Sequence, residues 1–110
     1  MGATKTDHFT KRQNNLATLA KALGHPARVA ILEFLLKSDA CICGDIVKEL
    51  PLEQPTVSQH LKELKNAGLI KGSIEGNAIC YCVNEKSIAQ LVGYFSQVSR
   101  KIIQKNNNCC

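Results

Sequence analysis

Proline and glycine divide this chain into short helical segments followed by a single hairpin signal, and this order limits the folds that it can adopt. Apolar residues recur at helical spacing over residues 9–23, where Gly24 supplies a stop. Pro26 then occupies a first-turn position, and residues 27–36 are apolar on nearly every face. The second segment is therefore predicted to be the buried centre of one domain, since 110 residues leave no room for two.

Two further helices are predicted on either side of a tight turn. A short helix at residues 45–50 ends before Pro51, because a proline disfavours helical geometry in the residue that precedes it. Pro55 then opens a helix over residues 55–67, and Gly68 ends it. Two short helices joined in this way form a helix-turn-helix.

A hairpin and a final helix complete the pattern. Residues 69–75 and 78–84 have strand character and flank Gly76-Asn77, a pair that tolerates the positive φ of a tight turn. An amphipathic helix is predicted over residues 87–105. The order predicts a mainly α fold with a small β-hairpin, which is a winged helix-turn-helix of the order α-α-α-α-β-β-α.

The first and last predicted helices have more apolar surface than one small core needs. Residues 9–23 and 87–105 would therefore form a homodimer interface, although both stripes could instead cover the same monomeric core. The predicted organisation is a flexible N-terminus at residues 1–8, a DNA-binding and dimerisation domain at 9–105, and a tail at 106–110 with two adjacent cysteines.

Charge and hydropathy narrow the classes of protein. Residues 56–110 contain 7 Lys and Arg against 3 Asp and Glu, whereas residues 1–55 contain 7 against 6, so the second half is the candidate surface for a polyanion. No segment is apolar for long enough to cross a bilayer, and residues 1–10 lack a signal-peptide core. The expected location is the cytoplasm, with no membrane partner.

The outer face of the helix at residues 55–67 is polar and has no net acid, as a helix in a DNA major groove requires. The alternative is an ordinary solvent-exposed helix face with no DNA-binding role. The preceding helix and the following hairpin make this interpretation less favourable. DNA binding is expected to need no cofactor. The candidate contacts are Gln54, Thr56, Ser58 and Gln59 for base edges, Lys62 and Lys65 for phosphates, and His60, Lys71 and Asn77 as further contacts.

Six cysteines fall in three close pairs. Cys41 and Cys43 lie just before or at the start of the helix at residues 45–50, where the helix dipole favours a thiolate and hence a soft metal. Two thiolates make a weak site, so a third ligand is expected from Cys109 or Cys110, unless the tail forms a site of its own or is only an exposed, dispensable end.

The remaining pair, Cys80 and Cys82, alternates with neighbours along a predicted strand and shares one face of it. Small buried side chains are the expected role of this pair. A second thiol site is the alternative.

Several separated motifs together resemble the ArsR/SmtB family of small metalloregulatory repressors. They are His25-Pro26-Ala27-Arg28-Val29-Ala30-Ile31-Leu32, Cys41-Ile42-Cys43-Gly44-Asp45, Gln54-Pro55-Thr56-Val57-Ser58-Gln59-His60-Leu61-Lys62-Glu63-Leu64 and Ala67-Gly68-Leu69-Ile70, and the likeness spans about residues 9–104. The resemblance implies a homodimeric winged helix that occupies operator DNA until an inducer binds. It also implies that Ser58 and Gln59 match positions that touch DNA.

The resemblance further implies that a Cys-x-Cys at this place binds arsenic, antimony, cadmium or lead. The chain departs from the commonest pattern, because Gly44 precedes Asp45 and residue 46 is Ile where some arsenic sensors have a third cysteine. The family's zinc site on the last helix is not expected, since no histidine follows His60. Thiolate chemistry favours trivalent arsenic or antimony, then cadmium, lead or copper(I).

The expected function is a repressor that an inducer at Cys41 and Cys43 releases from a pseudo-palindromic double-stranded operator. One alternative is a winged-helix repressor switched by cysteine oxidation. Another is a thiol enzyme or metal carrier, against which the sequence has no Cys-x-x-Cys, no phosphate-binding glycine loop and no paired acid and base. The chain is therefore not expected to be an enzyme.

Overall fold

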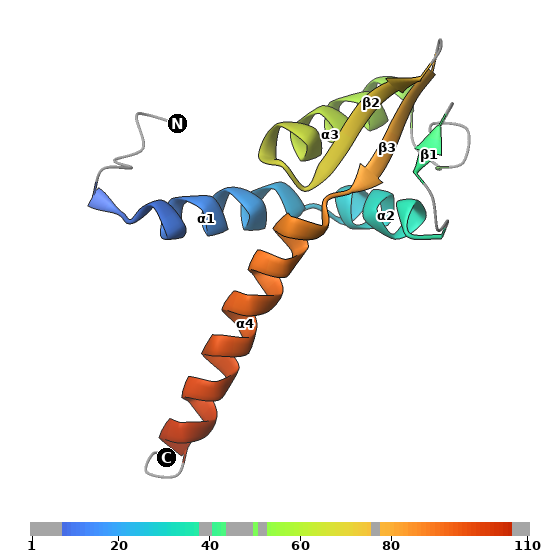
Figure 1. Cartoon of the computed structure of the whole chain (residues 1–110). Coiled ribbons are helices and arrows are strands. Elements are labelled where there is room, and N and C mark those ends of the chain that lie inside the picture. Colours follow the sequence, from blue (N-terminus) through green and yellow to red (C-terminus); the bar gives the residue numbers. More distant parts are fainter. Residues whose placement is uncertain (1–7, 38–40, 44–49, 51–52, 76–77, 107–110) are drawn as a thin grey trace.

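The computed structural model describes residues 8–37, 41–43, 50, 53–75 and 78–106. In chain order the elements are α1 (Lys11–Leu23), α2 (Pro26–Leu35), β1 (Ile42–Cys43), α3 (Gln54–Ala67), β2 (Ile70–Glu75), β3 (Ala78–Val83) and α4 (Glu85–Asn106). Figure 1 shows α4 projecting as one long helix away from the other helices and the sheet. The winged helix is confirmed, while most of the helix predicted at residues 45–50 lies outside the described residues.

Local capping explains where the first two helices begin. Thr10 accepts a hydrogen bond from the Gln13 backbone N–H and donates its own N–H to the Gln13 side chain, each at 3.0 Å. This reciprocal pair satisfies two donors that the first turn of α1 leaves unpaired. His25 caps α2, because its Nδ1 accepts from the Ala27 N–H at 3.0 Å, and Pro26 follows at the first helical position. The two helices are therefore separated by a short, fixed corner.

One hydrophobic core joins the three short helices, the sheet and the start of α4. Its buried members are Leu19, Ala22, Ile31, Leu32, Leu35, Val57, Leu61, Leu64, Leu69, Ile70 and Leu91. α2 lies at the centre, as predicted, and Ile31 has no exposed surface. Its other face is open, since Val29 is 39% and Leu36 is 67% exposed, so a single chain encloses α2 less than its apolar composition predicts.

The end of α3 and the start of α4 share one polar junction. Gly68 ends α3 in the left-handed region, with φ 87°, which a residue with a β-carbon adopts only under strain. The Gly68 carbonyl oxygen accepts hydrogen bonds from Asn84 Nδ2 at 2.9 Å and from Ser87 Oγ at 2.6 Å. Asn84 also accepts from the Lys86 N–H at 3.1 Å and so caps α4. The junction fixes where α4 leaves the domain.

The sheet has three antiparallel strands in the order β1-β3-β2. The hairpin of β2 and β3 is the predicted wing. β1 was not predicted from the sequence. Cys41 and Cys43 were expected just before or at the start of a helix, but the structure places Ile42–Cys43 in a strand. Ile42 lies opposite Tyr81 in β3, and Cys43 lies opposite Cys80. A strand this short is stabilised by its partner, and local sequence does not reveal that partner.

α4 contacts α1 along part of its length and is open beyond it. Arg12 Nη2 donates to Gln97 Oε1 at 2.7 Å, and its guanidinium lies 5.6 Å from the centre of the Tyr94 ring. Four large apolar side chains of α4 are more than half exposed: Val92, Phe95, Ile102 and Ile103. Among the helices that the structure describes, none is both long enough and apolar enough to span a bilayer.

Candidate functional site

α3 packs one face into the core and leaves the opposite face to solvent. Val57 and Leu64 have no exposed surface. Five of the predicted DNA contacts are exposed on this helix: Thr56, Ser58, Gln59, Lys62 and Lys65. Gln59 Nε2 donates to Glu63 Oε1 at 3.1 Å, one turn along, which orients the Gln59 amide along the helix. The outer face therefore presents hydroxyl and amide groups of the kind that hydrogen-bond to base edges.

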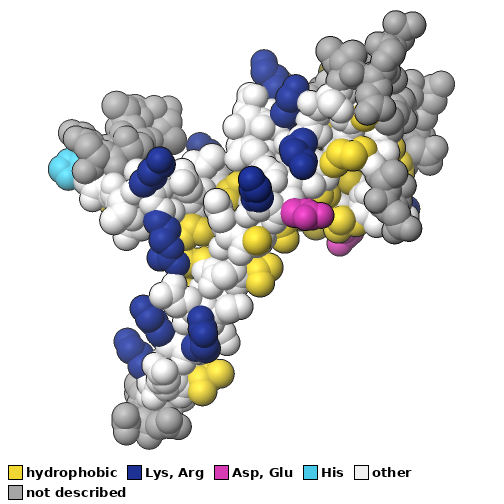
Figure 2. Space-filling model, in the orientation of Figure 1, with side chains coloured by type: hydrophobic (Ala, Val, Ile, Leu, Met, Phe, Trp, Pro, Cys, Tyr) yellow, Lys and Arg dark blue, Asp and Glu magenta, His cyan; other side chains and the backbone are white. Residues whose placement is uncertain are grey.

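The wing lies directly beside α3. The side chain of Lys65 extends from α3 over β2 and passes Gly72, the glycine of that strand. A β-carbon at Gly72 would lie 3.4 Å from Lys65 Cε and 3.3 Å from the Tyr81 ring. Lys71, the residue before Gly72 in β2, is exposed, and its side chain leaves the opposite face of the strand from the position that Lys65 covers. Lys and Arg side chains gather over α3 and β2 on the face drawn in Figure 2. Cations therefore gather where α3 meets the wing, as phosphate binding requires.

His60 lies inside the domain, at the contact between α3 and α2. Its side chain is only 8% exposed. Its Nδ1 accepts from Arg28 Nε at 3.1 Å, the His25 ring lies 4.4 Å away between centroids, and Arg28 Nη1 also donates to the Ala22 carbonyl at 3.1 Å. Burial, then the His25 ring and the Arg28 guanidinium, lower the pKa of His60 below its ordinary value. A neutral His60 accepting from Arg28 therefore fastens α3 to α2.

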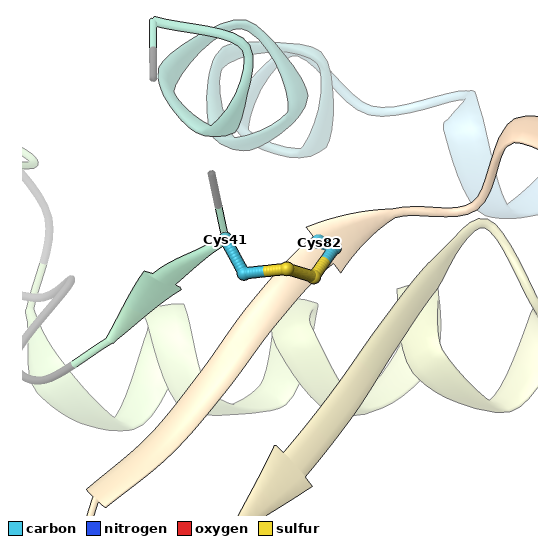
Figure 3. Close-up of a disulfide and its surroundings, with 2 residues drawn as sticks. All are labelled: Cys41 and Cys82. Atoms are coloured by element: carbon cyan, nitrogen blue, oxygen red, sulfur yellow. A yellow bond between two sulfur atoms is a disulfide. The ribbon is translucent and has the colours of Figure 1, made fainter. Parts of the chain in front are cut away.

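The described cysteines meet across two strands. Cys41, directly before β1, is disulfide-bonded to Cys82 in β3, and their Cα atoms are 4.6 Å apart (Figure 3). Two residues further along the ladder, Cys43 lies opposite Cys80, which is 1% exposed and is also disulfide-bonded. The segment after α2 and the wing strand therefore bring two Cys-x-Cys pairs together.

A surface pocket of about 670 Å³ opens beside the Cys41–Cys82 pair. Its walls come from α2, the wing and the first turns of α4, and they include Leu35, Val83 and Ile88. Lys71 and Glu85 supply charged groups at the same pocket. Lys71 is also the direct cross-strand neighbour of Cys82. A nearby cation favours the thiolate over the thiol, so the reduced pair would be accessible and suited to soft ligands.

Some predicted contacts have no described side chain. Asn77, Cys109 and Cys110 lie outside the described residues, and for Gln54 and Cys43 only the backbone is described. Among the described side chains, no group of three or more His, Cys, Asp or Glu converges on one point. Among the described side chains, the sulfur atoms of Cys41 and Cys82 are therefore the ones that lie together for an inducer.

Sequence reasoning left Cys82 out of the thiol site. The pairing depends on β1, which sequence did not predict, although one signal was present. Cys80 and Cys82 repeat the spacing of Cys41 and Cys43, and two runs with the same alternation can face each other in an antiparallel pair.

Comparison with known families identifies the chain's class. Residues 25–71 match the family described as bacterial regulatory protein, arsR family. An uncharacterized HTH-type transcriptional regulator of Mycobacterium tuberculosis, Rv0081, is 34% identical over 89 residues, covering 81% of this chain and 75% of the relative. The HTH-type transcriptional repressor SmtB of the same organism is 39% identical over 74 residues, covering 67% of this chain and 54% of that protein.

Solved structures agree with this class at the level of fold. An ArsR-like transcriptional regulator from Rhodococcus sp. RHA1 superposes with a TM-score of 0.77 at 19% identity, covering 89% of this chain and 92% of that one. A homodimeric winged helix-turn-helix DNA-binding domain from Mycobacterium bovis, a possible ArsR-family regulator, gives 0.64 at 22% identity, covering 99% and 97%. These proteins are transcriptional regulators and not enzymes. With its polar, exposed α3 face beside the wing, this chain belongs to the ArsR family of DNA-binding transcriptional regulators.

Proposed function

We propose that the protein is a cytoplasmic, homodimeric repressor that binds double-stranded operator DNA and is released by a thiophilic inducer. The observation that supports DNA binding best is the division of α3. Its apolar residues are buried in the core, while Ser58, Gln59 and Lys62 are exposed on the opposite face. The relative described as a repressor supports the direction of regulation.

In this proposal α3 enters the major groove. Ser58 and Gln59, with Thr56 and Gln54 nearer the start of the helix, read base edges, and lysines contact phosphates. The phosphate contacts are Lys62 and Lys65 from α3 and Lys71 from the wing, with Asn77 in the turn between the wing strands. We assign His60 an indirect role, because its ring is buried against α2 and positions the helix.

The exposed apolar face of α4, together with α1, supports dimerisation. Side chains such as Phe95, 61% exposed, and Ile103, 63% exposed, are costly to leave in water. A twofold pairing through these helices presents two copies of α3, and the operator should then be a pseudo-palindrome with half-sites about 34–36 Å apart. The M. bovis neighbour described as homodimeric has the same fold.

We propose trivalent arsenic or antimony as the inducer, with cadmium, lead and copper(I) as the next candidates. The support is a pair of cysteines held together at a surface pocket, because soft ions prefer thiolates. Inducer and operator would then disfavour each other by a coupling of about 1–3 kcal/mol, a typical allosteric value that corresponds to about 5–150-fold in affinity.

The DNA-binding part is tested with the double variant Ser58→Ala, Gln59→Ala. Loss of base contacts should weaken operator binding by about 1–3 kcal/mol per base read and reduce discrimination against unrelated DNA. Fluorescence anisotropy with operator and scrambled duplexes at fixed salt measures both. Gln104→Ala, an exposed amide on α4, is the control. Unchanged operator affinity in the double variant would remove α3 from this role.

A second candidate is a repressor switched by oxidation, and the Cys41–Cys82 disulfide favours it. Arsenite and hydrogen peroxide, added separately to the reduced operator complex, distinguish the two. Release by arsenite in the presence of a thiol reductant supports the metalloid. Release by peroxide alone supports oxidation and contradicts the metalloid proposal.

A further inference from the structure

The proposed inducer site lacks a third ligand, and the fold supplies one. Trivalent arsenic takes three sulfurs, and Cys41 and Cys43 provide two. The structure bonds Cys41 to Cys82 of the wing strand, so the sulfur atoms of these two residues reach the same point. Cys43 lies two residues along the same ladder, and residues two apart in an extended segment share a face.

We propose that Cys41, Cys43 and Cys82 form a three-thiolate site for trivalent arsenic or antimony, so that the wing, and not the C-terminal tail, completes the sensor. This inference rests on the proposed function and assigns its ligand set. Residues 41 and 43 are about 6.6 Å apart along the extended backbone, a spacing within the reach of two thiolates that bind one ion.

Accessibility separates the wing's two cysteines. Cys82 lines the pocket together with Cys41, while Cys80 is 1% exposed and packs in the interior. Neutral arsenous acid can therefore reach Cys82 without unfolding the sheet. Lys71 lines the same pocket opposite Cys82 and favours its thiolate. These contacts favour Cys82 as the third ligand over Cys80, which is buried and disulfide-bonded.

The chemistry balances without a change in the oxidation state of arsenic. A low-molecular-weight thiol first reduces the Cys41–Cys82 disulfide and the disulfide of Cys80: each S–S bond and two RSH give two cysteine thiols and RSSR. Arsenous acid, As(OH)₃, then exchanges its three hydroxyls for three sulfurs. The three thiol protons leave with those hydroxyls as three waters, and three As–S bonds form.

Binding of the ion by Cys82 would also couple the inducer site to the DNA-binding surface. Cys82 pairs across β3 and β2 with Lys71, a proposed phosphate contact, and β3 leads directly into the Asn84 junction that holds α3 to α4. An ion that fixes the spacing between Cys41 and Cys82 therefore sets how the wing lies against the rest of the domain. Release from DNA requires that the inducer and the DNA favour different conformations of the protein. Two positions of the wing, one of them favoured by the bound ion, would meet this requirement.

Arsenite titration of the reduced, DNA-free full chain tests the ligand set. Arsenic–sulfur absorption reports binding, a thiol reagent counts the protected cysteines, and mass spectrometry gives the stoichiometry. The wild type should bind one arsenic per chain and protect three thiols. Cys82→Ser should weaken binding by about tenfold or more, given that even indirect ligand support is worth 10–100-fold. Cys80→Ala, from the same strand, and the double variant Cys109→Ser, Cys110→Ser should bind as the wild type does.

Two controls keep the result interpretable. Circular dichroism and operator affinity without arsenite show whether each variant is folded, and Cys82→Ala provides a second substitution at the same position. Wild-type arsenic affinity in folded Cys82→Ser, or loss of binding in the tail variant, would overturn the assignment. Failure of the proposed function is separate: the wild type would then bind arsenic through three thiols while its operator affinity stayed unchanged.

Discussion

The amphipathic helices α3 and α4 bury their apolar faces to different extents. α3 buries Val57 and Leu64 completely within the chain, whereas α4 leaves Phe95 61% and Ile103 63% exposed. Both helices have one apolar and one polar face, so the sequence pattern describes them equally. The difference shows that α3 completes its packing inside one chain, while α4 presents a surface that a second chain can cover.

The largest expected effect is a loss of folding stability when a buried side chain of α3 is shortened. Leu64→Ala removes a fully buried side chain from the centre of the core and should lower the free energy of unfolding by about 2–5 kcal/mol. Chemical denaturation at one protein concentration measures it. A loss below about 1 kcal/mol would mean that α3 is not packed as described.

The next largest effect should appear in dimerisation and not in the stability of the single chain. Phe95→Glu places a charge on the exposed apolar face of α4 and should raise the dimer dissociation constant at least about tenfold, since an unpaired charge is costly to bury. Analytical ultracentrifugation measures this, and circular dichroism should show an intact fold. Gln104→Glu is the matched control, because residue 104 lies on the opposite side of the helix. Equal dissociation constants for the two variants would contradict dimerisation through this face.

A smaller effect is expected where the two helices meet. Ser87→Ala removes the 2.6 Å hydrogen bond to the Gly68 carbonyl, which keeps its bond from Asn84, so the loss should be about 0.5–1.5 kcal/mol. Thermal and urea unfolding measure it. Ser58→Ala, at an exposed position of α3, should stay within about 0.5 kcal/mol of the wild type. Equal stability of the two variants would show that the junction adds nothing.

The smallest effect is a dependence on pH in the contact between α3 and α2. The pKa of His60 is lower in the folded state than its ordinary value of about 6.5, so the unfolded chain binds the proton more readily. Stability should therefore be full above pH 6.5 and fall as the pH drops below it. His60→Asn, compared with the wild type between pH 5 and 8, should reduce this slope. An unchanged slope would assign the dependence to other groups.

Prediction from sequence succeeded where local chemistry decides the outcome. Gly68 marked the end of α3, and the alternation after it predicted the wing, because left-handed caps and strand periodicity are properties of a few neighbouring residues. The candidate DNA contacts could be placed on α3 for the same reason. Their exposure agrees with that proposal, which the operator experiment tests.

The thiol site could not be predicted in the same way. Cys41 and Cys82 are separated by 41 positions in the chain, and they meet only because β1 pairs with β3. His60 shows the same limit: a polar residue beside an apolar stripe can face DNA or the core, and its contact with Arg28 depends on how α2 crosses α3.

The sequence by itself determined the order of α1, α2, α3, the wing and α4, the polar face of α3 and the family, because each follows from local spacing and residue type. The tertiary structure decided which cysteines share a site and where His60 lies. It also decided which apolar face is left uncovered, because these properties depend on contacts between residues far apart in the chain, and chain-distant contacts form only when the strands pair and the helices pack.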